Sequence, residues 1–325
     1  MTVNSSHLDT SRVASRHWAI GVIFSVQTSV GILGNFSLLL HYVSLSLRGL
    51  RVRVTDVILR HLTTANSLVI LSKGITQTMA ALGVRDFLSD VGCKLVFYLH
   101  KVGRGVSMGT TCFLSVSQMV TISPWTSRWA ELKERTSQNT DYYMTLIWVL
   151  HVSVNFVVMI HVNSNLSGKN ITRNRYFGYC SVAFQNEITA SLLVLLLLLP
   201  DVASLGLMLW ASSSMVSMLY MHRQRVQHLH RAHVTPRASP ESRATQNILV
   251  LLSTFVTCYT FSSICHICIA FSKNPSWWMV NISALCAACF PTISPFLLRS
   301  PHCRLCGLCW VYMGGTNTPS VMGTV

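Results

Sequence analysis

Five ionisable side chains stand within long apolar stretches of the sequence, where charge is costly: Lys73, His100, Lys101, Arg104 and Asp201. Three of them are fixed cations and one is an acid, which leaves two positive charges without a match. Cations in such a setting can form charge-assisted hydrogen bonds to a carboxylate, sulfate or carbonyl group. These residues predict a site for a small molecule that carries a polar or anionic group on an apolar body.

Two arrangements of these charges remain open. In one, Arg104 or Lys101 pairs with Asp201 as a structural bridge, and Lys73 extends towards the membrane surface. In the other, Lys73, Lys101 and His100 face an open and mostly apolar cavity. A neutral ligand also fits the second arrangement if His100 is uncharged and Asp201 and chloride balance the site. The candidate walls of that cavity are Tyr98, Met108 and Trp277.

The stretch 93–123 holds three of these side chains and predicts a central helix. Its thirty residue steps correspond to about 45 Å of helix, the thickness of a bilayer with its headgroup layers. Polar side chains recur within it at steps of three or four, so they line one face: His100, Arg104, Ser107, Thr111, Ser115 and Gln118. We therefore expect this helix to lie inside a bundle, with its polar face turned inward.

The composition indicates a membrane protein. Of the 325 residues, 50% are hydrophobic and only 11% are charged, and the mean hydropathy is +0.45. Soluble domains carry about 25% charged residues. The net charge of +15 does not indicate a nucleic-acid partner, because no loop combines a basic patch with stacking aromatic residues. We interpret the basic excess as a topology signal beside membrane lipid.

Seven apolar runs are each near or above the length of about 20 residues needed to cross a bilayer. They predict an all-α membrane protein, a seven-transmembrane-helix bundle, because helices of this length satisfy their own backbone in lipid. The predicted organisation is an extracellular segment 1–16, a seven-helix domain 17–299 and a cytoplasmic tail 300–325. The runs are 18–47, 56–83, 93–123, 141–162, 187–220, 245–271 and 277–298.

Two patterns predict that the N-terminus is outside and the C-terminus inside. With this orientation, fourteen Lys and Arg residues fall in inner segments and eight in outer segments, as the positive-inside rule requires. The glycosylation sequons at Asn4, Asn165 and Asn170 all fall on the outer side. Two further sequons, at Asn35 and Asn281, lie within spans, where they cannot be glycosylated.

The cysteines divide by location. Six lie within spans and pack as small apolar residues, and only Cys93 and Cys180 clearly belong to the oxidising outer surface. A disulfide between them would fix the loop 163–186 to the third span; two free thiols are the alternative. The tail contains three further cysteines, Cys303, Cys306 and Cys309. We expect first that they are lipidated. The alternative is that they carry no modification, and zinc binding is the weakest interpretation.

The longest inner connection, 221–244, contains four histidines whose spacing fits no compact set of metal ligands. We interpret it as a basic extension of the fifth span that a cytoplasmic partner can dock against. We expect neither a cofactor nor a metal, and no nucleophile–base set indicates an enzyme.

Ten motifs resemble, in order, those of vomeronasal type-1 receptors. They are 73–81 (KGITQTMAA), 92–100 (GCKLVFYLH), 105–112 (GVSMGTTC), 127–133 (SRWAELK), 178–181 (GYCS), 200–202 (PDV), 224–228 (QRVQH), 239–246 (SPESRATQ), 274–278 (NPSWW) and 290–296 (FPTISPF). The resemblance runs from about residue 20 to 298, and the tail beyond Arg299 departs from the family pattern.

This resemblance implies a chemosensory G-protein-coupled receptor of the plasma membrane. Its partners would be a pheromone-like small molecule, volatile or steroid-like, and a heterotrimeric G protein of the inhibitory class. We expect the G protein to contact the inner ends of the third, fifth and sixth spans, near Gln118, Arg225 and Gln246. A transporter or channel is the alternative function, although the sequence shows no repeated half or matched pair of broken helices.

Overall fold

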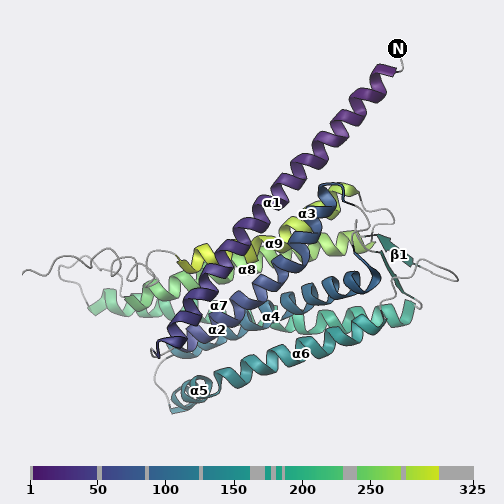
Figure 1. Cartoon of the computed structure of the whole chain (residues 1–325). Helices are drawn as coiled ribbons and strands as arrows, with labels where there is room; N and C mark the ends of the chain where they lie inside the picture. Colours follow the sequence, from purple (N-terminus) through teal and green to yellow (C-terminus); the bar gives the residue numbers. More distant parts are fainter. Residues whose placement is uncertain are drawn as a thin grey trace, which may run out of the picture.

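The structure is a computed structural model that describes residues 3–49, 53–84, 88–123, 127–161, 173–176, 181–184, 187–229, 240–271 and 276–299. Long helices run lengthwise through it (Figure 1). In chain order the elements are α1 (Val3–Leu47), α2 (Val54–Val69), the π-helical turn η1 (Ile70–Gly74), α3 (Ile75–Ala81), α4 (Asp90–Ile122), α5 (Ser127–Gln138), α6 (Thr140–His161), the strands β1 (Arg173–Tyr176) and β2 (Ser181–Phe184), α7 (Glu187–Leu229), α8 (Pro240–Phe271) and α9 (Trp277–Arg299).

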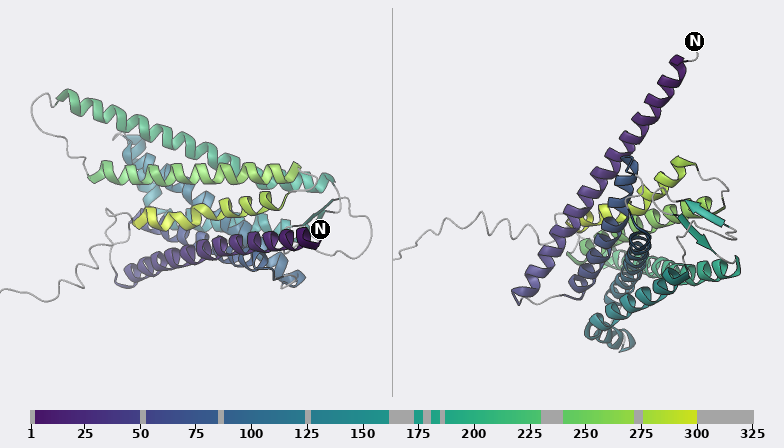
Figure 2. Two further views of the ribbon diagram at one scale, coloured as in Figure 1. Left: turned by 90° about the horizontal axis from the view of Figure 1, so that it is seen from above. Right: turned by 45° about the vertical axis from the view of Figure 1, so that its right-hand side comes forward.

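The predicted seven-helix architecture is confirmed. To within two residues, each of the seven apolar runs lies in one helix, except that run 56–83 comprises α2, η1 and α3 in succession. As a result, α1 begins and α9 ends at opposite ends of the bundle (Figures 1 and 2). We call these the hairpin end, where β1 and β2 lie, and the α5 end; which of them faces outside stays a prediction.

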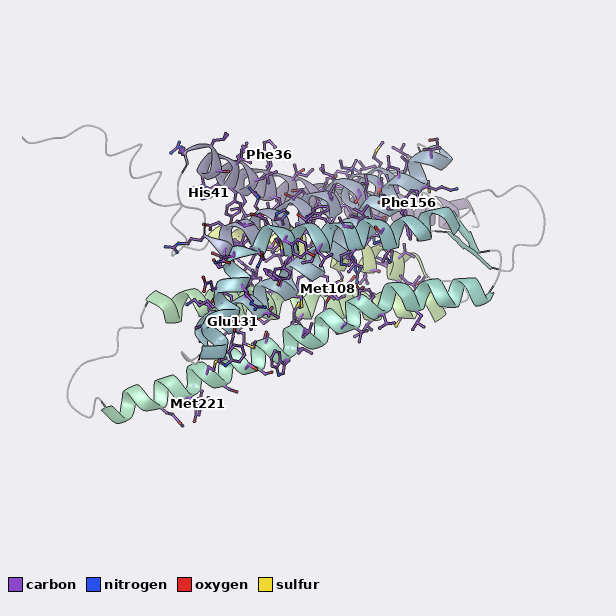
Figure 3. The ribbon with its side chains drawn as sticks, turned by 90° about the horizontal axis from the view of Figure 1, so that it is seen from below. Phe36, His41, Met108, Glu131, Phe156 and Met221 are labelled. Atoms are coloured by element: carbon purple, nitrogen blue, oxygen red, sulfur yellow. The ribbon has the colours of Figure 1, made fainter. Side chains whose placement is uncertain are left out.

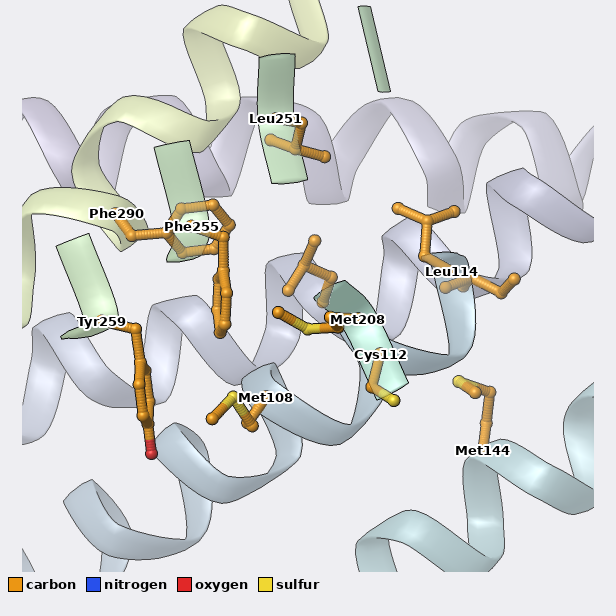
Figure 4. Close-up of a cluster of buried hydrophobic side chains, with 11 residues drawn as sticks. Met108, Cys112, Leu114, Met144, Met208, Leu251, Phe255, Tyr259 and Phe290 are labelled. Atoms are coloured by element: carbon orange, nitrogen blue, oxygen red, sulfur yellow. The ribbon is translucent and has the colours of Figure 1, made fainter. Parts of the chain in front are cut away.

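The predicted central position of α4 is also confirmed. It packs against α2, α6, α7 and α8, and it also contacts η1 and α5. Met108 of α4 is fully buried in a core that every one of these long neighbours reaches (Figure 4). The other members of this core include Leu62 of α2, Met144 of α6, Met208 of α7, Phe255 of α8 and Phe290 of α9.

Local sequence signals fix where α3 ends and α4 begins. Gly83 follows α3 in a left-handed conformation (φ 89°), and the amide of Val84 donates to the carbonyl of Met79. This is the hydrogen-bond pattern that ends many helices at a glycine. Ser89 then caps α4, because its hydroxyl accepts a hydrogen bond from the amide of Gly92 at 3.3 Å. The turn therefore directs the chain back into the bundle as the central helix.

The outer surface of the bundle is apolar, as a lipid environment requires. Phe36 on α1 and Met221 on α7 lie at the periphery, whereas Met108 lies between the helices (Figure 3). Among the described helices, Trp18–Leu47 and Trp278–Leu298 are long and apolar enough to be recognised as spans by composition alone, each with a mean hydropathy of 1.5. The helix α4 is not recognised as a span in this way, because its buried polar residues lower its mean hydropathy. Its place among the other long helices identifies it as a span.

Four features of the fold were not predicted. The helix α1 already begins at Val3, within the segment 1–16 that we expected to be separate from the first span. A helix, α5, lies between the third and fourth spans, and the paired strands β1 and β2 lie between the fourth and fifth. The second span contains the π-helical turn η1. The helix α8 also begins at Pro240, before the predicted limit of its span at residue 245. The continuation of α7 to Leu229, by contrast, agrees with the expected basic extension of the fifth span.

Glycine allows α4 to lie close to α2. A Cβ atom added at Gly103 would lie 3.0 Å from the carbonyl oxygen of Ala65 and 3.0 Å from Cβ of Leu68. The first of these atoms belongs to the backbone of α2, and the second is bonded directly to that backbone, so neither can move aside freely. By contrast, a Cβ atom at Gly206 of α7 would meet nothing within 4 Å.

We predict that Gly103→Val destabilises the receptor by about 1–3 kcal/mol, the usual cost of overpacking a tight contact. The measurement is thermal unfolding of the detergent-purified protein. Gly206→Ala is the matched control and should be neutral or slightly stabilising, because alanine is the better helix former. Equal stability of the two variants would show that the α2–α4 contact is not as tight as the structure indicates.

Candidate ligand site

A small cavity lies between α2, α4, α8 and α9. Its lining combines the polar groups of Arg104, Ser107 and Tyr259 with the apolar rings of Phe255 and Phe290. About 30 Å³ of it is open to the centres of water-sized molecules. This volume holds two or three waters, since a single water needs about 10–15 Å³ of such space. This cavity is therefore too small for a larger ligand unless its walls separate.

Arg104 links α4 to α8 through several contacts. Its guanidinium donates to the hydroxyls of Ser262 and Ser263, each at 3.2 Å. The same group lies over the ring of Tyr259, with its central carbon 4.3 Å from the ring centroid. A cation over an aromatic face in a partly buried site contributes roughly 1–2 kcal/mol. Arg104 thus contacts two neutral acceptors and a π-face.

Tyr259 links this group to α7. It is buried in α8, and its phenol donates a short hydrogen bond to a carboxylate oxygen of Asp201. Among the described residues no carboxylate lies within 4.0 Å of Arg104 or of Lys101, so the direct bridge to Asp201 that we considered does not form. The cation and the acid are instead joined through one phenol. We call Arg104, Tyr259 and Asp201, with Ser262 and Ser263, the α4–α8–α7 cluster.

Lys73 and Lys101 differ from Arg104 in their partners. Lys73 lies in η1 and interacts electrostatically with both Arg104 and Lys101. Lys101 lies 5.7 Å from the ring centroid of Phe97. Within the described chain, neither ammonium group forms a hydrogen bond, and neither has a carboxylate within 4.0 Å. Three positive charges are therefore gathered near one acid, and the lysines hold the unmatched charge.

The other predicted pocket residues are distributed differently. His100 is 7% exposed and lies one residue before Lys101, but it does not line the cavity. Tyr98 donates to the carbonyl of Val152 on α6, and Met108 lies in the core. The side chain of Trp277 lies outside the part of the chain that the structure describes. Of the five predicted ligand residues, Arg104 lines the cavity and Asp201 is linked to it through Tyr259.

A second buried polar network lies beside the cavity. The amide of Asn66 on α2 donates to Ser294 of α9 at 2.9 Å and accepts from Ser107 of α4 at 2.8 Å. All three side chains are at most 4% exposed. Ser294 has only one other hydrogen bond among the described residues, a long one of 3.5 Å to the carbonyl of Pro291, so Asn66 ties three spans together. Farther towards the hairpin end, Gln77 donates to Asn281 at 3.1 Å and joins α3 to α9 in the same way.

Sequence reasoning missed Tyr259, Ser262 and Ser263. Their spacing was an available signal, because residues at i, i+3 and i+4 share one face of a helix. The polar candidates for ligand contact were limited to ionisable residues, although hydroxyl groups within a span also need partners. The π-helical turn that holds Lys73 was missed as well. Such turns are rare in proteins, and those that occur often lie at functional sites.

Several predicted sites remain untested. Cys93 lies in the first turn of α4 and is not among the free cysteines of the described part, but Cys180 lies outside the described residues. The side chain of Asn4 and residues Asn165 and Asn170 are also outside, as are the tail cysteines Cys303, Cys306 and Cys309. Gln118 is half-buried on α4, whereas the side chains of Arg225 and Gln246 are not described.

The described chain contains no group of three or more His, Cys, Asp or Glu residues arranged to hold a metal ion. The site therefore consists of cations, hydroxyls and aromatic rings enclosed by spans. Such a site can bind a small molecule through hydrogen bonds and apolar contact.

Comparison with solved structures identifies the class of fold. Squid rhodopsin superimposes with a TM-score of 0.69 over 92% of this chain and 80% of its own, at 12% sequence identity. The chain thus has the seven-helix fold of squid rhodopsin.

Sequence comparison identifies the family. Residues 18–311 match the vomeronasal organ pheromone receptor family, and the chain belongs to it. It is 53% identical to human vomeronasal type-1 receptor 4 over 288 residues, 89% of this chain and 95% of that one. It is 51% identical to human vomeronasal type-1 receptor 2 over 87% of this chain and 72% of that one. The match continues past 298, so the family likeness extends further into the tail than we expected.

Replacing Asn66 tests the network beside the cavity. Asn66→Ala should lower the free energy of unfolding by about 1–3 kcal/mol, because it leaves Ser107 and Ser294 without this partner. Adding Ser107→Ala to Asn66→Ala should cost less than Ser107→Ala alone, as expected for residues of one network. Thermal unfolding in detergent measures both effects. The control is Ser213→Ala, whose exposed hydroxyl bonds only to its own helix; additive losses would contradict the network.

The Cys93–Cys180 pairing stays a prediction with a direct test. We expect one disulfide-linked peptide pair that contains both residues when surface-expressed receptor is digested without reduction. The bond should stabilise the fold by about 2–4 kcal/mol. Free thiols at both positions would contradict the pairing.

Proposed function

We propose that this chain is a chemosensory G-protein-coupled receptor of the plasma membrane that binds a small pheromone-like molecule within the bundle. Membership of the family supports the class of function, since its curated relatives are named vomeronasal receptors. We expect no catalytic activity, because those relatives are named as receptors.

The observation that carries the ligand proposal is the pair of lysines. Lys73 and Lys101 are cations within spans, close to Arg104, and form no hydrogen bond among the described residues. An uncompensated charge at this depth is costly, so a ligand that brings an acceptor gains more there than at the surface. The ligand class that fits is an apolar body, steroid-like or volatile, with one carboxylate, sulfate or carbonyl group.

The G-protein surface is proposed at the α5 end, taken as cytoplasmic. The basic connection between α7 and α8 begins there, and its arginines provide a field that suits an acidic partner surface. Gln118, Arg225 and Gln246 are the proposed contact residues, and the partner is a G protein of the inhibitory class. The tail cysteines would add lipid attachment at the same surface.

The test is a panel of small acids and sulfates, each matched with its neutral alcohol or ester. Nucleotide exchange on an inhibitory-class G protein is the readout, normalised to surface expression. For an acidic agonist, changing Lys73 and Lys101 to Met should raise the half-maximal concentration about 10- to 100-fold, the effect of losing one charge-assisted hydrogen bond. The neutral partner should change much less.

Lys94→Met is the matched control, because Lys94 lies near the beginning of α4 and away from the proposed site. If the double change weakened both members of an agonist pair equally, or neither, the anionic-ligand proposal would be wrong. Ion flux in cells that lack G proteins would instead support the alternative of a channel or transporter.

A further inference from the structure

Four free thiols lie along the contact between α8 and α9. These two helices pack extensively against each other and lie side by side (Figure 2). Cys258 and Cys265 are seven residues apart on α8, and Cys286 and Cys289 are three residues apart on α9. Each spacing keeps the two residues on one face of their helix. We call these four residues the thiol cluster; all are half-buried, and none is in a disulfide.

Cys286 is the member of the thiol cluster that contacts the others. Its side chain forms a hydrogen bond with that of Cys265 and interacts electrostatically with those of Cys258 and Cys289. Cys258 and Cys286 also line the small cavity that Arg104 lines, one from α8 and the other from α9. The thiol cluster therefore borders a space that admits an ion or a molecule of the size of water.

Neighbouring thiols are ligands for soft metal ions, above all copper(I) and zinc. Structural zinc sites have four ligands in a tetrahedral arrangement. Within the chain that the structure describes, no group of three or more His, Cys, Asp or Glu residues is arranged to hold a metal ion, so zinc does not fit. Copper(I) is a closed-shell monovalent ion that is stable with two thiolates in a straight line. The pair Cys265 and Cys286 meets this smaller requirement.

The charges around the cavity favour such a complex. A thiol that coordinates a metal ion loses its proton. One copper(I) ion and two thiols therefore form a bis-thiolate complex with one negative charge, and two protons leave. Arg104 lines the same cavity as Cys286, and Lys73 and Lys101 interact electrostatically with Arg104. Because these cations exceed the nearby acid in number, a negatively charged complex offsets part of the unmatched charge.

We propose that the thiol cluster binds one copper(I) ion between α8 and α9, with Cys265 and Cys286 as its two ligands. This inference goes beyond the proposed function and does not depend on it, because metal binding is measured without an agonist or a G protein. It also differs from our expectation from sequence, in which the cysteines within spans were only small packing residues and the chain took no metal.

The test is a titration of the purified full-length receptor with copper(I) without oxygen, in competition with a chelator that becomes coloured when it binds copper(I). The three tail cysteines are changed to Ser in every sample, so that they do not bind the ion. We expect one copper(I) per receptor, with sulfur ligands in X-ray absorption. Cys265→Ala and Cys286→Ala should each weaken binding by more than about 100-fold, since even the outer partners of a metal site contribute about 10- to 100-fold.

The matched controls are Cys268→Ala, an exposed thiol of α8, and Cys112→Ala, a thiol of α4 in the apolar core. Both should bind copper(I) as tightly as the parent receptor. Thermal unfolding in detergent is the second measurement, and it also shows that each variant is folded. Copper(I) should raise the unfolding temperature of the parent and the controls but not of the two ligand variants. No bound copper(I) in the parent, or binding that neither ligand variant weakens, would overturn the proposal.

Discussion

Within a bilayer there is no water to satisfy a polar group, and this constraint organises the whole bundle. Apolar side chains such as Phe36 face outward, and several polar side chains of the spans find partners on neighbouring helices. Asn66 joins three spans in this way, and Gln77 joins two. Because each of these bonds needs both partners at depth, they fix the relative rotation of the helices as well as their contact. Glycines such as Gly103 then allow the backbones to approach.

The same constraint separates the three cations into two kinds. Arg104 is matched by hydroxyls, an aromatic face and, through Tyr259, the acid of Asp201. Lys73 and Lys101 have no such set among the described residues. A guanidinium suits the first role because it is planar and offers several donors in a fixed geometry. An ammonium group is a compact charge on a flexible stem, which suits a ligand that arrives from elsewhere.

Much of this arrangement could be predicted from sequence, because the responsible signals are long or strongly periodic. The seven apolar runs predicted the spans, and the polar residues of 93–123 predicted the inward face of α4. What could not be predicted depends on how helices rotate against one another. The position of Asp201 within an apolar run predicts that its carboxylate has a partner, but several polar residues could reach it. The phenol of Tyr259 was not among the partners considered. The turn η1 was missed because it lies within a continuous apolar run, where a rare π-helical turn is not expected.

The length of α8 has a mechanical consequence. From Tyr259 to its first residue, Pro240, the helix continues for nineteen residues, or about 28 Å at the usual rise. A tilt of about 10° pivoting at Tyr259 would therefore displace the beginning of α8 by about 5 Å, which is close to one helical turn. The helix acts as a lever whose short arm lies at the cavity and whose long arm ends at the basic connection. A small tilt at the level of the cavity would thus become a displacement several times larger at the first residue of α8.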